Sequence, residues 1–159
     1  MAATDIAPIA DHMADLIGAL PDMGRVFTYD LWHRDDLADV IVSDIGGTPT
    51  ARAWWIVGPS LADPEYLTHA QPANAILRPW IWTVQCLEGL DAQNATSVSR
   101  LRTNLLAVMD ALDADRNMGG SAHRVDPCRV TEAPQIRLMG TWAFAYAELT
   151  KVIYTLSAP

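Results

Sequence analysis

The stretch Trp80-Ile81-Trp82-Thr83-Val84-Gln85-Cys86, inside the run 76–87, is the clearest strand in this sequence and the feature around which the fold is built. Aromatic and β-branched residues dominate it, which is typical of a strand. Side chains alternate across a strand, so one face carries the bulkier residues and the other the milder ones. The bulkier face holds Trp80, Trp82, Val84 and Cys86, and the milder face holds Ile81, Thr83 and Gln85. Pro79 cannot donate to a ladder, so this strand is expected to start at an edge or a bulge.

A second strand is predicted upstream, over 51–57. It contains Trp54 and Trp55, which must point to opposite faces because they are neighbours in a strand. Both faces are therefore apolar, whereas a sheet with one face in water would alternate apolar and polar residues. We expect each face to be covered by a helix, a loop or another subunit.

Two amphipathic helices are predicted, over 5–20 and 92–113. Each carries one apolar stripe at spacings of three and four residues. The stripes are Ile9, Met13, Leu16, Ile17 and Leu20 in the first helix, and Val98, Leu101, Leu105, Val108 and Leu112 in the second. Thr4 or Asp5 is the expected cap of the first helix, and Pro21 its stop.

The remaining segments are expected to be mainly strands. A short strand is predicted over 26–31, and two more over 123–132 and 136–149 around a turn at Ala133-Pro134. In the last of these, alanines alternate with bulky residues, so its small face is expected to let a helix approach closely. Residues 151–156 either prolong that strand or form an arm.

The segment 35–45 fits two structures. Leu37, Val40, Ile41 and Ile45 have helical spacing, while Ile41-Val42 before Gly46-Gly47 is equally consistent with a strand and a turn. The helical interpretation is favoured.

The long segment 59–75 is predicted to be a loop, because it holds Pro59, Pro64 and Pro72. Loops of this length in a compact domain are often functional. The apolar residues Leu61, Tyr66 and Leu67 favour a loop that docks on a partner over a disordered insertion. The six tryptophans fit two interpretations equally well, an interface, where tryptophan is enriched, and a tryptophan-rich core. The candidate interface residues are Trp54, Leu61, Tyr66, Leu67, Trp80 and Trp82.

Together these segments predict one α+β domain over 1–159, in which a mainly antiparallel sheet packs against two amphipathic helices in the order helix, strands, helix, strands. With 159 residues and a 50% hydrophobic share, the chain can form a core that needs no disulfide or metal to stabilise it. The two cysteines, Cys86 and Cys128, are expected to be free buried thiols rather than a disulfide, although both fall in predicted strands and a contact is open.

The charge balance disfavours binding to nucleic acid. The net charge is −8 and there is no basic cluster, so the phosphate backbone is an unfavourable partner, while DNA could slide past without adhering. No uncharged run approaches the roughly 20 residues of a membrane helix, and the N-terminus lacks the basic start of a signal peptide. We expect a protein made in a cytoplasm, with no membrane partner.

No catalytic, metal or cofactor signature is present. The cluster His33-Arg34-Asp35-Asp36 invites a general-base interpretation, but no nucleophile lies nearby in the sequence and a solvated turn is favoured. Ser121 and His123 lack the strand–elbow–helix context of a hydrolase, and His12 and His69 are isolated. The pairs Asp11 with Asp15 and Asp35 with Asp39 lack a third ligand for a hard cation. We expect a protein that is not an enzyme and that needs no cofactor or metal.

The order of elements resembles that of bacteriophage tail terminators, also called tail completion or minor tail proteins. The resemblance rests on the opening helix followed by Gly24-Arg25-Val26-Phe27, and on the strand Trp80 to Cys86. It continues in the helix with alternating arginine and leucine, Ser99 to Leu106, and in the closing strand Gly140 to Leu149. The segment 59–75 and the tryptophan-rich middle of the chain are not part of the family pattern.

This resemblance implies a structural virion protein at the head-proximal end of a phage tail, made in the cytoplasm of a bacterial host. The family forms rings, typically of six copies, that cap the tail tube protein and meet a head-side connector or stopper protein, with DNA passing through the lumen without specific binding. A head–tail connector or neck protein of the same particle is one alternative. A small α+β enzyme or ligand-binding domain is another.

Overall fold

The computed structural model describes residues 6–30, 37, 41–45, 47–66, 75–90, 94–139 and 142–157. About half of the described residues lie in strands and about a quarter in helices. The helices are α1 (Ala7–Gly18) and α3 (Asn94–Ala114). The strands are β1 (Arg25–Phe27), β2 (Val42–Ile45), β3 (Thr48–Leu61), β4 (Glu65–Tyr66), β5 (Ile76–Gly89), β6 (Arg124–Val125), β7 (Arg129–Met139) and β8 (Trp142–Ser157). No helix in this part of the chain is both long and apolar enough to cross a membrane.

The predicted α+β class with a mainly antiparallel sheet is wrong. The protein is mostly β, and its strands form one mixed, curled sheet. β1 pairs with β3 in parallel, through Val26 and Trp54, whereas β3, β5 and β8 run antiparallel to one another. Periodicity in a sequence reveals the type of an element but not its length or the direction of its pairing. β3 and β8 are both longer than the predicted strands, and this extra length makes the molecule mostly β.

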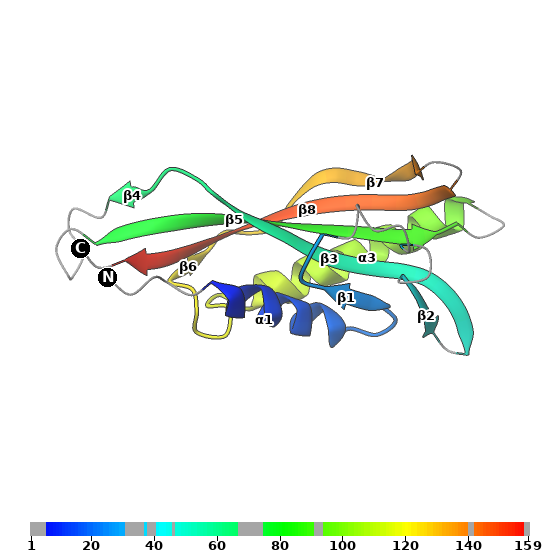
Figure 1. Ribbon diagram of the computed structural model, residues 1–159, viewed down its shortest axis with the longest axis horizontal. Helices are drawn as coiled ribbons and strands as arrows, with labels where there is room; N and C mark the ends of the chain where they lie inside the picture. The colour runs from blue at the N-terminus through cyan, green and yellow to red at the C-terminus, as the bar shows by residue number, and fades with distance from the viewer. Residues whose placement is uncertain are drawn as a thin grey trace.

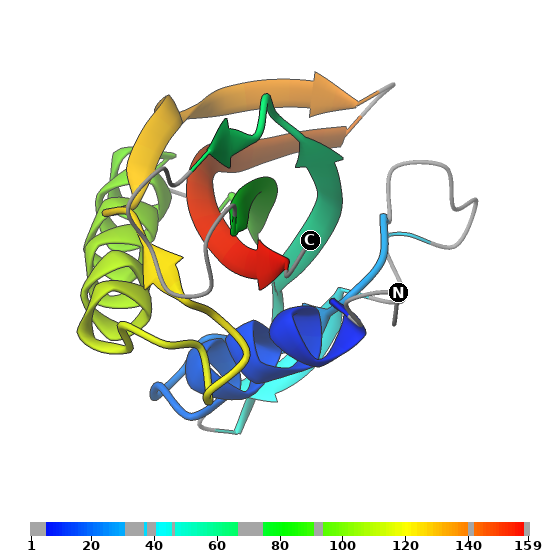
Figure 2. The same cartoon turned by 90° about the vertical axis from the view of Figure 1, so that its left-hand side faces the viewer.

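The sheet is built on three long central strands in the order β3-β5-β8. At one side, β1 and β2 pair with β3, and at the other side β6 and β7 pair with β8. The long strands twist around one another along the longest axis of the molecule (Figure 1), and the end view shows how strongly the sheet curls (Figure 2). β4 adds a short antiparallel pair to the start of β5.

Both helices cover the same face of the sheet, and the main core lies between them and the strands (Figures 1 and 2). Trp54 and Trp82 project from this face into the core, where Ala145 and Ala147 of β8 leave room for α3. The apolar stripes of both helices are confirmed. Buried positions are Ile9, Met13 and Ile17 in α1, and Leu101, Leu105, Val108 and Leu112 in α3. Pro8 lies in the first turn of α1, where its missing N–H costs nothing.

The other face of the sheet carries a second, smaller core. Trp55 is fully buried there, beside Leu87, Phe144 and Tyr146, and Ile41 and Leu37 cover it. The prediction that both faces of the strand around Trp54 and Trp55 are covered is therefore confirmed. Cys86 and Cys128 are free and buried, as predicted.

Several local predictions are wrong. The helix favoured over 35–45 is wrong for 42–45, which form strand β2 because they pair with β3 (Val42 with Ala51). Leu37 is helical and its carbonyl accepts a hydrogen bond from the Ile41 N–H at 3.1 Å, as in a helix. The rest of 35–45 lies outside the described residues. The strand predicted over 26–31 ends at Phe27.

Two predicted loops or turns are also strand. The segment predicted as a loop from Pro59 continues β3 to Leu61, where Ser60 pairs with Ile81, and it then forms β4. No turn occurs at Ala133-Pro134, which lies within β7 at a register shift. The reversal comes later, since Met139 pairs with Trp142, so 136–149 is not one strand. Residues 151–156 prolong β8.

Candidate assembly surface

The helix-side face of the sheet stays apolar out to β7, which pairs with β8 at one side of the sheet. One row of neighbours across the strands runs from Ile56 through Val84 and Leu149 to Val130. The first three side chains are buried in the main core, but Val130 is 43% exposed. Directly paired residues project from the same face of a sheet, so the apolar row ends in water at β7.

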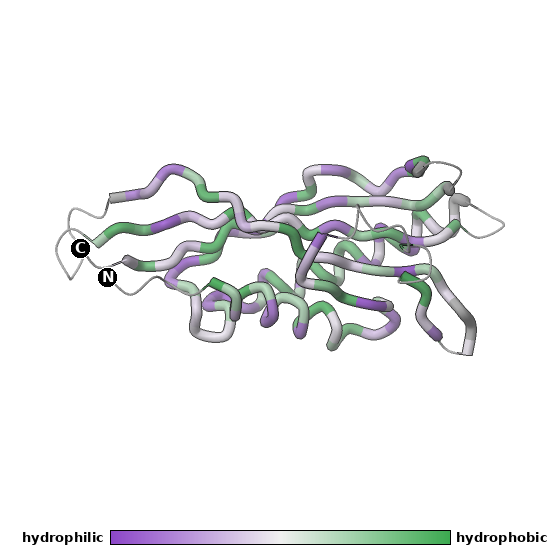
Figure 3. Tube along the Cα trace, in the orientation of Figure 1, coloured by the Kyte–Doolittle hydropathy of each residue, from purple (hydrophilic) through white to green (hydrophobic). Residues whose placement is uncertain are grey.

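Two further residues of β7 extend this exposed row. Ile136 pairs with the buried Ala145 and is 45% exposed, and Leu138 pairs with Ala143 and is 76% exposed. We call Val130, Ile136 and Leu138 the β7 apolar face. Leu106 of α3 is also exposed. It lies two residues after Asn104, a rotation of about 200° around the helix, and so on the opposite flank of α3 from Asn104. Figure 3 shows the hydrophobic residues of β7 separated by hydrophilic ones.

The outer edge of β7 adds backbone groups to this surface. Within the described residues, β7 pairs with β8 alone, so its other edge presents unpaired N–H and C=O groups over an eleven-residue strand. Pro134 lies in the middle of this edge, which is where a sheet tolerates proline. A long edge with exposed apolar side chains is a site for pairing with another chain.

The opposite face of β7 is polar and internally satisfied. Glu148 of β8 accepts hydrogen bonds from Thr131 Oγ1 at 2.9 Å, Gln85 Nε2 at 2.9 Å and Tyr146 Oη at 3.0 Å. Gln85 Oε1 in turn accepts a hydrogen bond from Trp55 Nε1 at 2.5 Å. Four strands are thereby linked by one side-chain network.

Arg137 closes this polar face. Its guanidinium carbon lies 4.1 Å from the centre of the Tyr146 ring, and its Nε donates to Glu132 Oε1 at 3.0 Å. A cation over an aromatic face is favourable, so Arg137 shields Tyr146 while pairing with the carboxylate.

The charges of the network shift two pKa values. Burial alone would raise the pKa of Glu148, but hydrogen bonds from Gln85, Thr131 and Tyr146 outweigh it and lower the pKa. Burial and the neighbouring Glu148 carboxylate raise the pKa of Tyr146. The two faces of β7 therefore differ: the polar face finds its partners within the chain, while the apolar face is left in water.

The candidate interface residues lie in different environments. Trp54 and Trp82 are buried in the main core of the chain. Trp80 is partly buried against that core and donates from Nε1 to Thr155 Oγ1 at 2.8 Å. Leu61 ends β3 and is 54% exposed. Tyr66 belongs to β4 but its side chain, like Leu67 as a whole, lies outside what the structure describes.

Only some of the polar residues weighed as catalytic candidates lie within the described part of the chain. His12 of α1 lies 2.6 Å from Asp115 (Nε2 to Oδ2), and this contact joins the helix to the loop after α3. His33 with its neighbouring Asp35 and Asp36, and His69, lie outside the described residues. Among the described residues, no group of three or more His, Cys, Asp or Glu side chains is placed to hold a metal ion.

Sequence reasoning missed the β7 apolar face. A single strand over 136–149, as predicted, would place Leu138 on the same face as Phe144 and Tyr146, because their numbers are all even. The hairpin between β7 and β8 instead places Leu138 opposite Ala143, on the other face. The signal that could have located the hairpin was Gly140, a common turn residue.

No protein family model matches the chain, and no curated protein is similar to it in sequence.

Proposed function

We propose that this protein is a structural subunit that assembles with copies of itself into a ring, and that the β7 apolar face and the free edge of β7 form one side of the contact. The observation that carries the proposal is the exposed apolar row of β7, on an edge that has no strand partner among the described residues. Burying a fully exposed side chain of this kind gains about 1.5–3 kcal/mol. Most of that gain is available at Leu138, which is 76% exposed, and less than half of it at Val130 and Ile136, which are 43% and 45% exposed.

A second copy of the chain is the occupant that the sheet itself favours. The opposite side of the sheet has its own open stretch, because beyond Val57 the outer edge of β3 has no strand partner among the described residues. The exposed Leu61 lies at the end of this stretch. Two different edges on opposite sides of one sheet allow a head-to-tail contact, and such contacts generate rings when the rotation closes.

On the resemblance to phage tail terminators, we propose that this ring sits at the head-proximal end of a tail tube. In that setting the ring is a hexamer, its other partners are the tail tube protein and a head-side connector, and DNA passes through its lumen. The net charge of −8 supports a lumen to which DNA does not adhere.

Light scattering on the purified protein, together with a single substitution, tests the proposal. The wild-type protein is expected to show a ring-sized mass, alone or when mixed with tail tubes. Leu138→Asp places a charge in the centre of the contact and is expected to reduce the mass to that of a monomer, with an unchanged circular dichroism spectrum.

Leu156→Asp is the matched control. Leu156 is also an exposed leucine in a strand, but it pairs with Leu77 at the far end of β8, away from β7. This variant is expected to assemble like the wild type. A wild-type protein that stays monomeric and ignores tail tubes would contradict the proposal, as would equal assembly by the two variants.

A further inference from the structure

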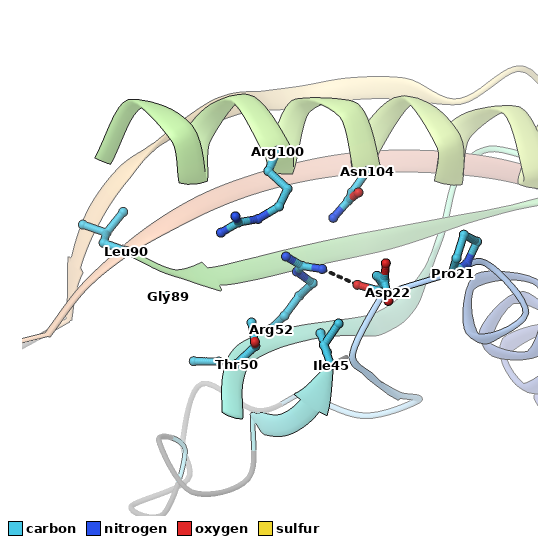
Figure 4. Close-up of a pocket in the computed structure, with 10 residues that line it drawn as sticks. Pro21, Asp22, Ile45, Thr50, Arg52, Gly89, Leu90, Arg100 and Asn104 are labelled. Atoms are coloured by element: carbon cyan, nitrogen blue, oxygen red, sulfur yellow. Dashed lines mark hydrogen bonds between the residues drawn. The ribbon is translucent and has the colours of Figure 1, made fainter. Parts of the chain in front are cut away.

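A pocket of about 800 Å³ opens where α3 passes over the neighbouring ends of β3 and β5 (Figure 4). Arg52 enters it from β3, and Arg100 and Asn104 enter it from α3. Asp22, from the turn after α1, and Leu90, which follows β5, complete its walls. The pocket lies on the flank of α3 that faces away from Leu106, so it is separate from the β7 apolar face.

The backbone of the turn after α1 is shaped to meet Arg52. Asp22 and Gly24 both have positive φ angles, 61° and 78°. Asp22 directs its backbone carbonyl at Arg52, which donates to it from Nη1. A Cβ at Gly24 would collide with the backbone carbonyl of Arg52, so only glycine allows this close approach.

Two guanidinium groups converge behind the pocket on one carboxylate. Glu88 is fully buried and accepts from Arg52 Nε at 3.2 Å and Nη2 at 3.1 Å, while Arg100 Nε donates to its Oε1. Arg52 is itself buried. Asp22 also carries a negative charge, but it is exposed at the rim, where water screens it. The inner part of the pocket therefore has more positive than negative charge, in a chain whose net charge is −8.

Asn104 adds a hydrogen-bond donor without a partner. Its Nδ2 is buried and finds no acceptor among the described residues. Buried polar groups in native proteins are almost always paired. The indole N–H groups of Trp54 and Trp82 also have no partner but lie in the main core, whereas Asn104 lines a pocket beside two guanidinium groups.

We propose that this pocket is a binding site for a carboxylate group. The Asn104 amide donates a hydrogen bond to one carboxylate oxygen, and the positive charges of Arg52 and Arg100 hold the anion. Guanidinium groups favour carboxylates in partly desolvated sites, and pockets of this size accept small organic ligands. The same chemistry is offered by a free organic acid and by an acidic side chain of a protein. This site does not depend on ring assembly.

Calorimetric titration of the native protein with succinate, at constant ionic strength set with chloride, tests the site. A saturable heat is expected with succinate and none with the neutral succinamide. A short peptide whose one carboxylate is an aspartate side chain forms the second arm, and binding of either acid supports the site. Absence of saturable heat with both acids would overturn it, as would tighter binding of inorganic phosphate.

Two substitutions in the pocket are expected to weaken succinate binding and a third to strengthen it. Asn104→Asp and Arg100→Gln are expected to weaken binding at least tenfold, whereas Asp22→Asn removes the charge at the rim and is expected to strengthen it. Arg102→Gln is the matched control, because Arg102 is an exposed arginine two positions along the same helix. Should the first two variants fail to fold, the contrast between Asp22→Asn and Arg102→Gln remains decisive. Effects of equal size and opposite sign in those two variants would show a general effect of net charge and overturn the proposal.

Discussion

The buried tryptophan side chains of this protein mainly fill space in the two cores. Trp54, Trp55 and Trp82 are buried on one face or the other of the same sheet. The indole N–H groups of Trp54 and Trp82 have no hydrogen-bond partner among the described residues, whereas Trp55 donates to Gln85. The first two rings therefore contribute apolar contact rather than polar bonding, and a smaller apolar ring should replace them at a modest cost.

Trp82→Ala is expected to destabilise the protein by about 3–5 kcal/mol, because it leaves a large cavity between the sheet and the helices. Trp82→Phe is expected to cost about 1–2 kcal/mol, since part of the volume is kept and the lost N–H had no partner. Urea unfolding followed by circular dichroism measures both. A mild effect of the alanine variant would contradict a core role for Trp82.

At the scale of elements, the sequence predicted well wherever one period dominates. Both helices and their apolar stripes follow from spacings of three and four residues. The neighbouring Trp54 and Trp55 indicated that both faces of their strand are covered. Proline misled the prediction in two places, at Pro59 and at Pro134. Each was read as a break, but β3 continues past the first and β7 runs through the second at a register shift. A strand edge accepts proline, and no local pattern reveals where the edges lie.

The network that joins β5, β7 and β8 at Glu148 should make stability depend on pH. The pKa of Glu148 is lower in the folded protein than in the unfolded chain. The ionised Glu148 side chain therefore makes its full contribution to the free energy of unfolding above the pKa of an unfolded glutamate, about 4.3. This contribution is lost as the pH falls through the lower pKa of Glu148 in the folded protein.

Glu148→Gln is expected to destabilise the protein by about 1–2 kcal/mol at pH 7, because the hydrogen bonds to a charge are lost. The difference between variant and wild type is expected to shrink as the pH falls below about 4 and through the lowered pKa of folded Glu148, because the carboxyl group is then protonated. Urea unfolding at each pH measures it. A difference that stays constant with pH would show that Glu148 is not held ionised by its three donors.

At the scale of the whole molecule, the curled sheet could not be predicted from the sequence. It depends on long-range pairs such as Cys86 with Ala147, and on a hairpin that places Leu138 opposite Ala143. The pocket beside α3 was missed for the same reason, because Arg52, Glu88 and Arg100 lie on three separate elements. Arginines in a sequence give no sign of which ones converge.

Charge repulsion between copies should make assembly depend on salt. Each chain carries a net charge of −8, so neighbouring copies repel one another at low ionic strength. Raising sodium chloride from about 20 mM to about 300 mM shortens the screening length and is expected to increase the mass measured by light scattering at fixed protein concentration. A mass that falls with salt would instead indicate a contact held by ion pairs, rather than by the β7 apolar face.

The position of β8 in the sheet constrains the order in which the chain can fold. β8 pairs with β5, β6 and β7, and all three precede it in the sequence. While the ribosome is still making the chain, one whole edge of β5 stays unpaired until β8 emerges. Contacts between such distant segments form slowly, and a waiting edge is prone to aggregation. Synthesis of this protein therefore includes an interval in which the central strand needs protection, and a chaperone that shields β5 during that interval would raise the yield of folded chains.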